Sequence, residues 1–241
     1  MKVSFVVPAY NEERLLPATL ASLAAGSAAF AARGWATELV VCDNNSSDGT
    51  PQVASAAGAR VVFEPVNQIS RARNAGAGAA SGDWLVFVDA DSQPSRELLE
   101  EVALAIEGGR CVAGGSTVRF ETSSLAAVLP VGLWNGISRA LHWAAGSFIF
   151  CEAAAFREAG GFSEALYAAE EIDLSRRLKK LARAQHRRVV ILHRHPLLTS
   201  SRKLQLYSVR EQLGFMARTI FARGDTLKSA KACYLWYDGR R

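Results

Sequence analysis

Two aspartates separated by one small residue, Asp89 and Asp91, end the apolar run of Phe87 and Val88. If this run is a strand, its side chains alternate, so both carboxylates leave the same side of the chain where it stops being buried. Hard divalent cations such as Mg²⁺ or Mn²⁺ are commonly held by one or two carboxylates together with substrate phosphates. The pair therefore indicates a metal site for a phosphate-bearing substrate. A plain turn is the alternative, because Asp is common at strand ends and residues 92–94 have the composition of a turn before a helix.

Short apolar segments alternate with helical ones over the first two-thirds of the chain, which predicts an α/β fold with a mostly parallel central sheet flanked by helices. The expected strands are residues 2–8, 38–43, 60–64 and 84–89, and the expected helices are residues 12–32, 51–57 and 70–80. Asn11, Thr50 and Ser70 are the expected helix caps. Ligands of such sheets bind beyond the carboxyl ends of the strands, so we expect these ends to form one site.

Polar residues follow the first two of these strands. Pro8, Ala9, Tyr10 and Glu12 lie between the first strand and a helix, where free backbone N–H groups are also available. Asp43 ends the second strand, and its carboxylate can accept hydrogen bonds from a nucleobase or a ribose. We therefore predict a nucleotide site, although every strand must end in a loop and polar loops also occur without a ligand.

Two arginines stand near the start of the third expected helix. Cations oppose the helix dipole at that end, so a ligand phosphate or the nearby aspartates must compensate them. We predict that Arg73 contacts the nucleotide. For Arg71, a solvated surface position is an equally good interpretation.

The rest of the chain continues the α/β pattern without a repeat or a linker. The expected elements are a helix from Pro94 to about Gly108, a strand at 111–121, a Trp-bearing helical region to 142, a strand at 147–151, a segment at 152–159 that precedes the Gly-Gly-Phe at 160–162, a helix at 168–184 and a strand at 188–193. We expect one domain over residues 1–241. Its expected parts are a nucleotide-binding part at 1–95, an acceptor and catalytic part at 96–200 and a helical C-terminal tail at 201–241.

Four segments together resemble family 2 glycosyltransferases, which have the GT-A fold. They are Pro-Ala-Tyr-Asn-Glu-Glu at 8–13, Val-Cys-Asp-Asn-Asn-Ser-Ser-Asp-Gly-Thr at 41–50, Ala-Arg-Asn-Ala-Gly at 72–76 and Asp-Ala-Asp at 89–91. The resemblance implies a nucleoside-diphosphate sugar as donor and Mg²⁺ or Mn²⁺ as the metal. It implies that the Tyr10 and Glu12 loop and Asp43 hold the nucleotide, with Arg73 alongside. It also implies that Asp89 meets ribose or phosphate and that Asp91 binds the metal.

The same family takes its catalytic base from an acidic pair that opens a later helix. Glu170 and Glu171 resemble that motif and place a glutamate, Glu171, at the base position, where the commoner pair has aspartate. A carboxylate with a pKa of about 4 is a weak base at neutral pH unless burial or neighbouring acids raise it, and Glu170, Asp173 and the two aspartates of the predicted metal site are available to do so. An amphipathic surface helix is the alternative. It explains an Asp173–Arg177 pair but not two adjacent glutamates beyond their favourable interaction with the helix dipole.

Histidines and cations follow near the last expected strand. Some GT-A enzymes use a late histidine as a further metal ligand, and by this resemblance His195, or else His193, binds the metal; a surface histidine is the alternative. Arg202 and Lys203, joined by Arg194, are expected to screen diphosphate charge or to face an anionic acceptor or membrane.

The composition fits a folded chain with anionic partners. Hydrophobic residues make up 49% and charged residues 21% of the 241 residues, which argues against disorder, and the net charge is +5. The cations are dispersed without interleaved aromatic residues, so we expect no nucleic-acid binding. The four cysteines form no Cys-x-x-Cys pair and are expected to be reduced thiols.

No apolar run reaches the roughly 18 to 20 residues that span a membrane. The most hydrophobic region, 125–150, contains Asn135, Arg139 and His142. We favour a helix packed on the core here, with an amphipathic surface that touches lipid as the alternative. The N-terminus enters a strand pattern at once and lacks the pattern of a signal peptide. We expect a cytoplasmic location, with peripheral contact to the inner face of the membrane as the alternative.

The resemblance, together with these residues, implies inverting, metal-dependent transfer of a sugar to an acceptor hydroxyl or a lipid phosphate, on a glycan or a lipid-linked acceptor. A nucleotidyltransferase is one alternative, but such enzymes usually carry a glycine-rich, basic loop where this chain has residues 8–11. A non-catalytic nucleotide-sugar-binding protein of the same fold is the other. The presence of Asp89, Asp91 and Glu171 argues against it.

Overall fold

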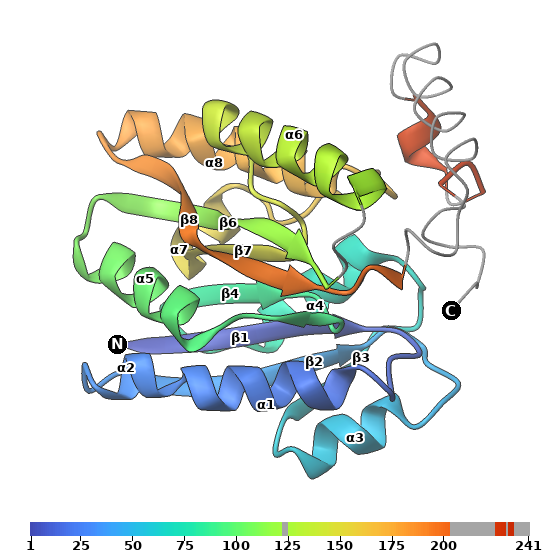
Figure 1. The fold of residues 1–241 in the computed structure, drawn as a ribbon. Coiled ribbons are helices and arrows are strands. Elements are labelled where there is room, and N and C mark those ends of the chain that lie inside the picture. The colour runs from blue at the N-terminus through green and yellow to red at the C-terminus, as the bar shows by residue number, and fades with distance from the viewer. Residues whose placement is uncertain (122–124, 203–224, 230, 234–241) are drawn as a thin grey trace.

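The computed structural model describes residues 1–121, 125–202, 225–229 and 231–233 (Figure 1). Its centre is an eight-stranded sheet with the order β3-β2-β1-β4-β7-β6-β8-β5. The strands are β1 (Lys2–Ala9), β2 (Ala36–Asp43), β3 (Arg60–Phe63), β4 (Trp84–Val88), β5 (Ser92–Gln93), β6 (Cys111–Phe120), β7 (Phe148–Glu152) and β8 (Arg188–Thr199). All but β7 and β5 run in one direction, so the sheet is mixed but mostly parallel, as predicted.

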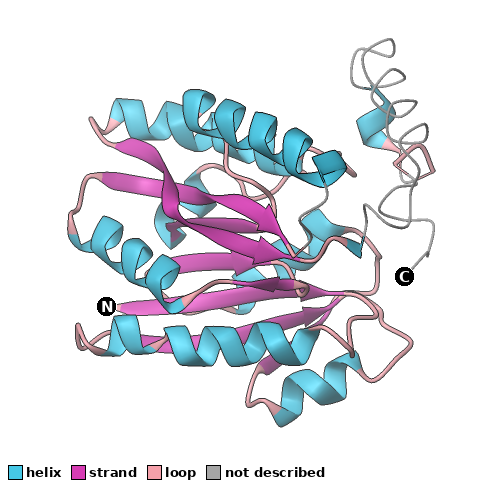
Figure 2. Ribbon diagram, in the orientation of Figure 1, coloured by secondary structure: helices cyan, strands magenta, loops and turns pink. Residues whose placement is uncertain are grey.

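Helices cover both faces of this sheet (Figure 2). They are α1 (Leu16–Gly26), α2 (Ala28–Ala31), α3 (Thr50–Ala56), α4 (Ile69–Ala79), α5 (Arg96–Glu107), α6 (Leu125–Leu141), α7 (Ala153–Glu158), α8 (Glu170–Ala184) and the 3₁₀ helix η1 (Asp225–Lys228). One core cluster joins the sheet to α1, α2 and α5, and another joins it to α7 and α8. Every residue of β4 is buried, which explains why its sequence is an uninterrupted apolar run.

The helix expected at 12–32 is in fact two helices. Gly26 is the last residue of α1, and a Cβ there would lie 2.2 Å from Leu99 Cδ1 of α5, so glycine allows the close approach of these two helices. The chain turns at Ser27 and continues as α2.

The three expected helix caps are wrong. α1 begins after Leu15 without a side-chain cap, Thr50 lies inside α3, and Ser70 lies inside α4. Asn11 has a left-handed backbone with a φ of 52°, and its Oδ1 accepts a hydrogen bond from the Ser47 N–H at 2.8 Å. Its side chain therefore joins two loops instead of ending a helix.

The strand expected at 188–193 extends to Thr199. Its register on β6 shifts between Leu192 and Leu197, so residues 193–196 bulge out opposite Thr117. Beyond the bulge, β8 pairs with the short strand β5, with Thr199 opposite Ser92. This pairing brings the end of β8 next to the Asp89–Asp91 segment.

The four cysteines are free and buried. In the part of the chain that the structure describes, no helix has the length and apolar character needed to cross a membrane. The predicted helical tail at 201–241 lies mostly outside the described residues.

Candidate active site

The carboxyl ends of β1, β2 and β4 meet at one edge of the sheet, on the right-hand side of Figure 1. Ala9 lies opposite Asp43 in the parallel ladder, and the Asn44 N–H donates to the Ala9 carbonyl at 2.8 Å. Because β4 runs parallel to β1 on its other side, Asp89 follows at the same edge. The structure thus brings together the strand ends that the sequence assigned to one site.

Hydrogen bonds join the loops that follow β1 and β2. The Asn11 N–H donates to Ser46 Oγ at 2.9 Å, and the Glu12 N–H donates to Thr50 Oγ1 at 2.8 Å. Asp48 Oδ1 accepts from the Thr50 N–H at 3.0 Å, which gives Asp48 a structural role at the start of α3. These bonds fix the two loops relative to each other on the predicted nucleotide side of the site.

Asn44 is a buried residue of the site that sequence reasoning missed. Its Nδ2 donates to the carbonyls of Glu64 and Val66 at 3.1 and 2.6 Å, and its Oδ1 accepts from the Gln68 N–H at 2.9 Å. It therefore anchors the loop before α4, next to the buried Asp43. The Asp-Asn-Asn run at 43–45 marked this segment as polar, but composition alone does not show that Asn44 is buried whereas Asn45 is exposed.

Asp89 and Asp91 have different partners. Asp89 Oδ1 accepts a hydrogen bond from Arg73 Nη2 at 2.9 Å, whereas Asp91 Oδ2 lies 3.9 Å from Arg202 Nη2. The Asp91 carbonyl accepts from the Ser200 N–H at 3.1 Å, which attaches this loop to the end of β8. The side chains of Asp89 and Asp91 are 22% and 13% exposed, so both remain partly open to a ligand.

Asp91 has the chemistry of a divalent-cation ligand. It presents carboxylate oxygens, the donors that Mg²⁺ and Mn²⁺ prefer, at the edge of the site. Across the described residues, no three side chains of His, Cys, Asp or Glu gather into a metal-binding group. The partly exposed Asp91 carboxylate fits a cation that would complete its shell with substrate phosphate and water.

Arg73 lies at the centre of the site with a side chain that is only 2% exposed. Its Nη1 donates to Glu170 Oε1 at 2.6 Å, and its Nη2 donates to the Gly146 carbonyl at 2.8 Å as well as to Asp89. The Phe162 ring lies 5.1 Å from the guanidinium carbon. Burial lowers the pKa of Arg73, but the negative charges of Asp89 and Glu170 outweigh it and hold the pKa above its ordinary value.

Glu170 and Glu171 open α8, where the sequence predicted the base. Glu170 is paired with Arg73, while Glu171 lies near Gly146, where an added Cβ would be 3.5 Å from Glu171 Cδ. Burial, together with the negative charges of Glu170 and Asp89, raises the pKa of Glu171 to about 8. Glu171 is nevertheless partly exposed, so it combines proton affinity with access, as a general base requires.

Arg202 reaches the site from the last turn of chain after β8. Its Nη2 and Nη1 donate to the two carboxylate oxygens of Glu12 at 2.5 and 3.0 Å in a bidentate pair. Glu12, a predicted nucleotide contact, is thus neutralised by this arginine. The same guanidinium faces Asp91, so a cation stands beside the predicted metal ligand. Lys203 lies outside the described residues.

His195 lies in the bulge of β8. Its Nδ1 is 2.6 Å from Glu101 Oε1 of α5, and its neighbours His193 and Arg194 are also exposed. The metal role of His195 therefore stays a prediction.

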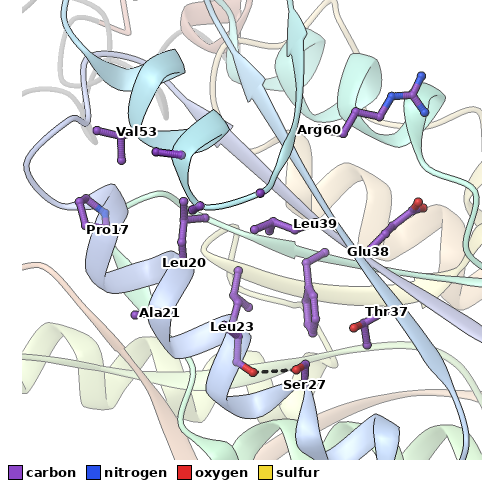
Figure 3. Close-up of a pocket in the computed structure, with 15 residues that line it drawn as sticks. Pro17, Leu20, Ala21, Leu23, Ser27, Thr37, Glu38, Leu39, Val53 and Arg60 are labelled. Atoms are coloured by element: carbon purple, nitrogen blue, oxygen red, sulfur yellow. Dashed lines mark hydrogen bonds between the residues drawn. The ribbon is translucent and has the colours of Figure 1, made fainter.

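A separate apolar pocket of about 830 Å³ lies between α1, α3 and β2 (Figure 3). Leu20, Leu39 and Val53 contribute to its lining, and no predicted active-site residue does. Glu38 at its margin is paired with Lys2 at 2.7 Å. The pocket is therefore separate from the predicted active site.

Most of this chain matches the model of a known protein family. Residues 4–159 match the family model described as Glycosyl transferase family 2. The chain belongs to glycosyltransferase family 2. This confirms the resemblance drawn from the sequence motifs, and the matched stretch includes Asp43, Arg73, Asp89 and Asp91. Glu171 lies beyond it.

Two curated family members match about half of the chain. An uncharacterized glycosyltransferase of Mycobacterium tuberculosis is 39% identical over 113 residues, which cover 46% of this chain and 47% of the relative. An undecaprenyl-phosphate 4-deoxy-4-formamido-L-arabinose transferase of Klebsiella pneumoniae is 36% identical over 115 residues, which cover 44% of this chain and 34% of that protein. The match thus spans about half the length of the first relative and a third of the second.

A solved structure identifies the fold. The mannosyltransferase PcManGT from Pyrobaculum calidifontis, in complex with GDP-Man and Mn²⁺, aligns with a TM-score of 0.65 at 19% identity. The alignment covers 96% of this chain and 64% of that chain. The family 2 chain therefore has the GT-A fold, as the sequence predicted.

Proposed function

We propose that the chain transfers a sugar from a nucleoside-diphosphate sugar to an acceptor, with inversion at the anomeric carbon and with Glu171 as the general base. The observation that carries this proposal is the bridge made by Arg73. One guanidinium holds Asp89 at the predicted donor edge and Glu170 beside the predicted base. The two halves of a transfer site thus share one buried cation.

In this proposal the nucleotide lies along the loop from Pro8 to Glu12, with Asp43, Arg73 and Asp89 beside it. Asp91 would hold Mg²⁺ or Mn²⁺, and the cation would supply positive charge for the departing diphosphate. The GDP-Man and Mn²⁺ complex of the structural neighbour supports this ligand class for the fold.

Glu171 accepts the proton of an acceptor hydroxyl as that oxygen attacks the anomeric carbon. The new bond forms opposite the leaving group, the bond from the anomeric carbon to the diphosphate oxygen breaks, and the nucleoside diphosphate leaves with the electron pair. One in-line displacement inverts the configuration. The raised pKa of Glu171, about 8, makes it a stronger base than an ordinary carboxylate.

A lipid phosphate is the second acceptor class, and the name of the Klebsiella relative, an undecaprenyl-phosphate transferase, favours it. An ionised phosphate needs no base, so Glu171 would then only position the acceptor. The two classes make opposite predictions for Glu171→Gln. Transfer to a hydroxyl is lost in this variant, whereas transfer to a phosphate is largely retained.

The test is a donor screen with UDP- and GDP-sugars in the presence of Mn²⁺ or Mg²⁺. We expect metal-dependent release of a nucleoside diphosphate, and we expect Asp91→Asn to abolish metal-dependent donor binding while Glu171→Gln binds donor normally. Glu158→Gln, an exposed change on α7, is the matched control and should behave as wild type. If the folded protein neither binds nor turns over any donor, the proposed glycosyltransferase activity is wrong. Release of pyrophosphate would indicate a nucleotidyltransferase instead.

A further inference from the structure

The outer side of α6 carries two exposed leucines between Pro130 and Leu141. Val131 and Trp134 pack against the core, and the Asn135 side chain bonds both the N–H and the carbonyl of Val118 at 3.0 and 2.8 Å. On the other side, Leu133 is 69% exposed and Leu141 is 41% exposed. A surface helix ordinarily turns polar residues outward, so exposed leucines on this side indicate a partner.

The outer side of α8 is basic. Arg176, Lys180 and Arg183 are exposed at i, i+4 and i+7, whereas Leu174 and Leu178 are buried. No Asp or Glu occurs in the sequence from residue 174 to residue 202. The cations on this side of α8 are therefore not neutralised by acids of their own segment.

The end of α6 and the middle of α8 are in contact. Lys179 Nζ donates to the Leu141 carbonyl at 2.5 Å, and the Arg176 guanidinium lies 4.9 Å from the centroid of the Trp143 ring. Figure 1 shows the two helices along the same side of the molecule. We call the combined surface the α6–α8 face; it consists of Leu133, Arg139, Leu141, Arg176, Lys180 and Arg183.

We propose that the α6–α8 face docks on a lipid bilayer that contains anionic lipids. The two leucines supply apolar area that enters the headgroup region, and the cations pair with lipid phosphates, which is the arrangement of interfacial amphipathic helices. The absence of acids from α6 and from α8 beyond Asp173 makes the charge of this face complementary to an anionic membrane. A single apolar partner would not need these cations.

Docking in this way also favours a lipid-linked acceptor. α8 begins with Glu170 and the proposed base Glu171 and continues into the basic face, so the acceptor side of the site lies at the membrane-facing helix. This consequence rests on the proposed function. The docking itself does not, because it is measured without donor or acceptor.

Vesicle co-sedimentation tests the docking. Wild type is expected to sediment with phosphatidylcholine vesicles that contain phosphatidylglycerol, to stay in solution with pure phosphatidylcholine, and to be released by salt. Lys180→Gln/Arg183→Gln is expected to bind roughly 30-fold more weakly, since each cation at an anionic leaflet contributes about 1 kcal/mol. Arg14→Gln/Arg96→Gln removes the same charge from exposed positions outside this face and should bind as wild type.

The apolar part of the face has its own pair of variants. Leu133→Ser is expected to weaken vesicle binding, whereas Leu104→Ser, at a leucine of α5 that is 53% exposed, is expected to leave it unchanged. Thermal melts of each variant establish that it is folded. The proposal is overturned if wild type ignores anionic vesicles, or if the α6–α8 variants bind as well as their controls. It is also overturned if light scattering shows a dimer that Leu133→Ser converts to monomer, which would make this face an interface between two copies.

Discussion

Arg73 Nη1 donates to Glu170 Oε1 at 2.6 Å, and this bond joins residues 97 positions apart in the sequence. Glu170 directly precedes the proposed base Glu171, and Asp89, the other carboxylate on Arg73, lies two residues before the proposed metal ligand Asp91. Arg73 therefore holds the residue beside the proposed base and a residue close to the proposed metal ligand. Through these two bonds, the buried Arg73 guanidinium fixes how far Asp89 lies from Glu170, and so how far the proposed metal ligand lies from the proposed base.

Arg73→Met should lower the free energy of unfolding by about 3–5 kcal/mol, because it leaves two carboxylates facing each other without their buried cation. Arg71→Met is the control: its partner Glu164 is 43% exposed, and exposed pairs contribute about 1 kcal/mol at most. Urea unfolding of both variants measures the difference. Adding Glu170→Gln to Arg73→Met should restore part of the loss, and equal losses for Arg73→Met and Arg71→Met would contradict the bridge.

Glu171 makes the stability of the fold depend on pH. Its pKa is raised from an ordinary 4.5 to about 8, so between these values the folded state holds a proton that the unfolded state has released. The free energy of unfolding attributable to Glu171 therefore falls as the pH rises from about 4.5 to 8. Glu171→Gln should lack this fall and be more stable than wild type at pH 8. Unfolding measured at several pH values checks this, and parallel curves for wild type and variant would rule it out.

The pH dependence of transfer has the opposite sign. The proposed base Glu171 would act as a carboxylate, so kcat/KM for a hydroxyl acceptor should rise with pH up to about 8 and then level off. A phosphate acceptor needs no proton removal at Glu171, and its profile should not show this rise. Initial rates across the pH range, with Glu158→Gln as the control, distinguish the two.

The edge of the sheet was predictable because short-range signals specify it. An apolar run that ends in Asp89 and Asp91 indicates a strand end, and parallel strands bring their ends together. The sequence also named burial, Glu170, Asp173 and the aspartates of the predicted metal site as able to raise the pKa of Glu171. Glu170 and Asp89 act on Glu171, whereas Asp173 is paired with Arg177 at 2.6 Å.

Pairings between distant segments could not be predicted. Arg202 meets Glu12 across 190 positions, and this depends on a bulge in β8 and on the pairing of β8 with β5. Arg73 had several carboxylates within reach, and only packing decides that it is buried between Asp89 and Glu170 and not turned to solvent. The prediction that Asn11 caps a helix was wrong for the same reason, because its side chain bonds the loop after β2.

Arg202 should compete with a divalent cation at Asp91. Its guanidinium lies 3.9 Å from Asp91 Oδ2, so Arg202→Gln removes a like charge from the predicted metal position. We expect Mn²⁺ to bind about five-fold more tightly in the absence of nucleotide, since a charge pair at this distance in water interacts by about 1 kcal/mol. Titration of Mn²⁺ followed by its electron paramagnetic resonance signal measures this, with the exposed Arg194→Gln as control. Unchanged or weaker Mn²⁺ binding would contradict a metal at Asp91.

Gly161 lies beside Asn74 and Phe162, and the Phe162 ring packs against the Arg73 guanidinium. Its φ is 67°, and an added Cβ would lie 2.8 Å from Asn74 Oδ1, the atom that accepts the Phe162 N–H at 2.9 Å. Gly160 has a similar φ of 81°, but a Cβ there would meet nothing closer than 4.0 Å. Both alanine variants should therefore lose about 1–2 kcal/mol for the left-handed backbone, and Gly161→Ala should lose more through the clash.

A double-mutant cycle isolates this second part. Asn74→Ala removes the clashing atom, so the extra loss of Gly161→Ala over Gly160→Ala should shrink when each is combined with Asn74→Ala. Because the Phe162 ring lies 5.1 Å from the Arg73 guanidinium, displacing the Asn74 contact should also loosen Arg73 and lower the rate of transfer. Urea unfolding and initial rates on the same four variants check both effects. If the two glycine variants lose the same stability in both backgrounds, the Asn74 contact does not hold Phe162 under Arg73.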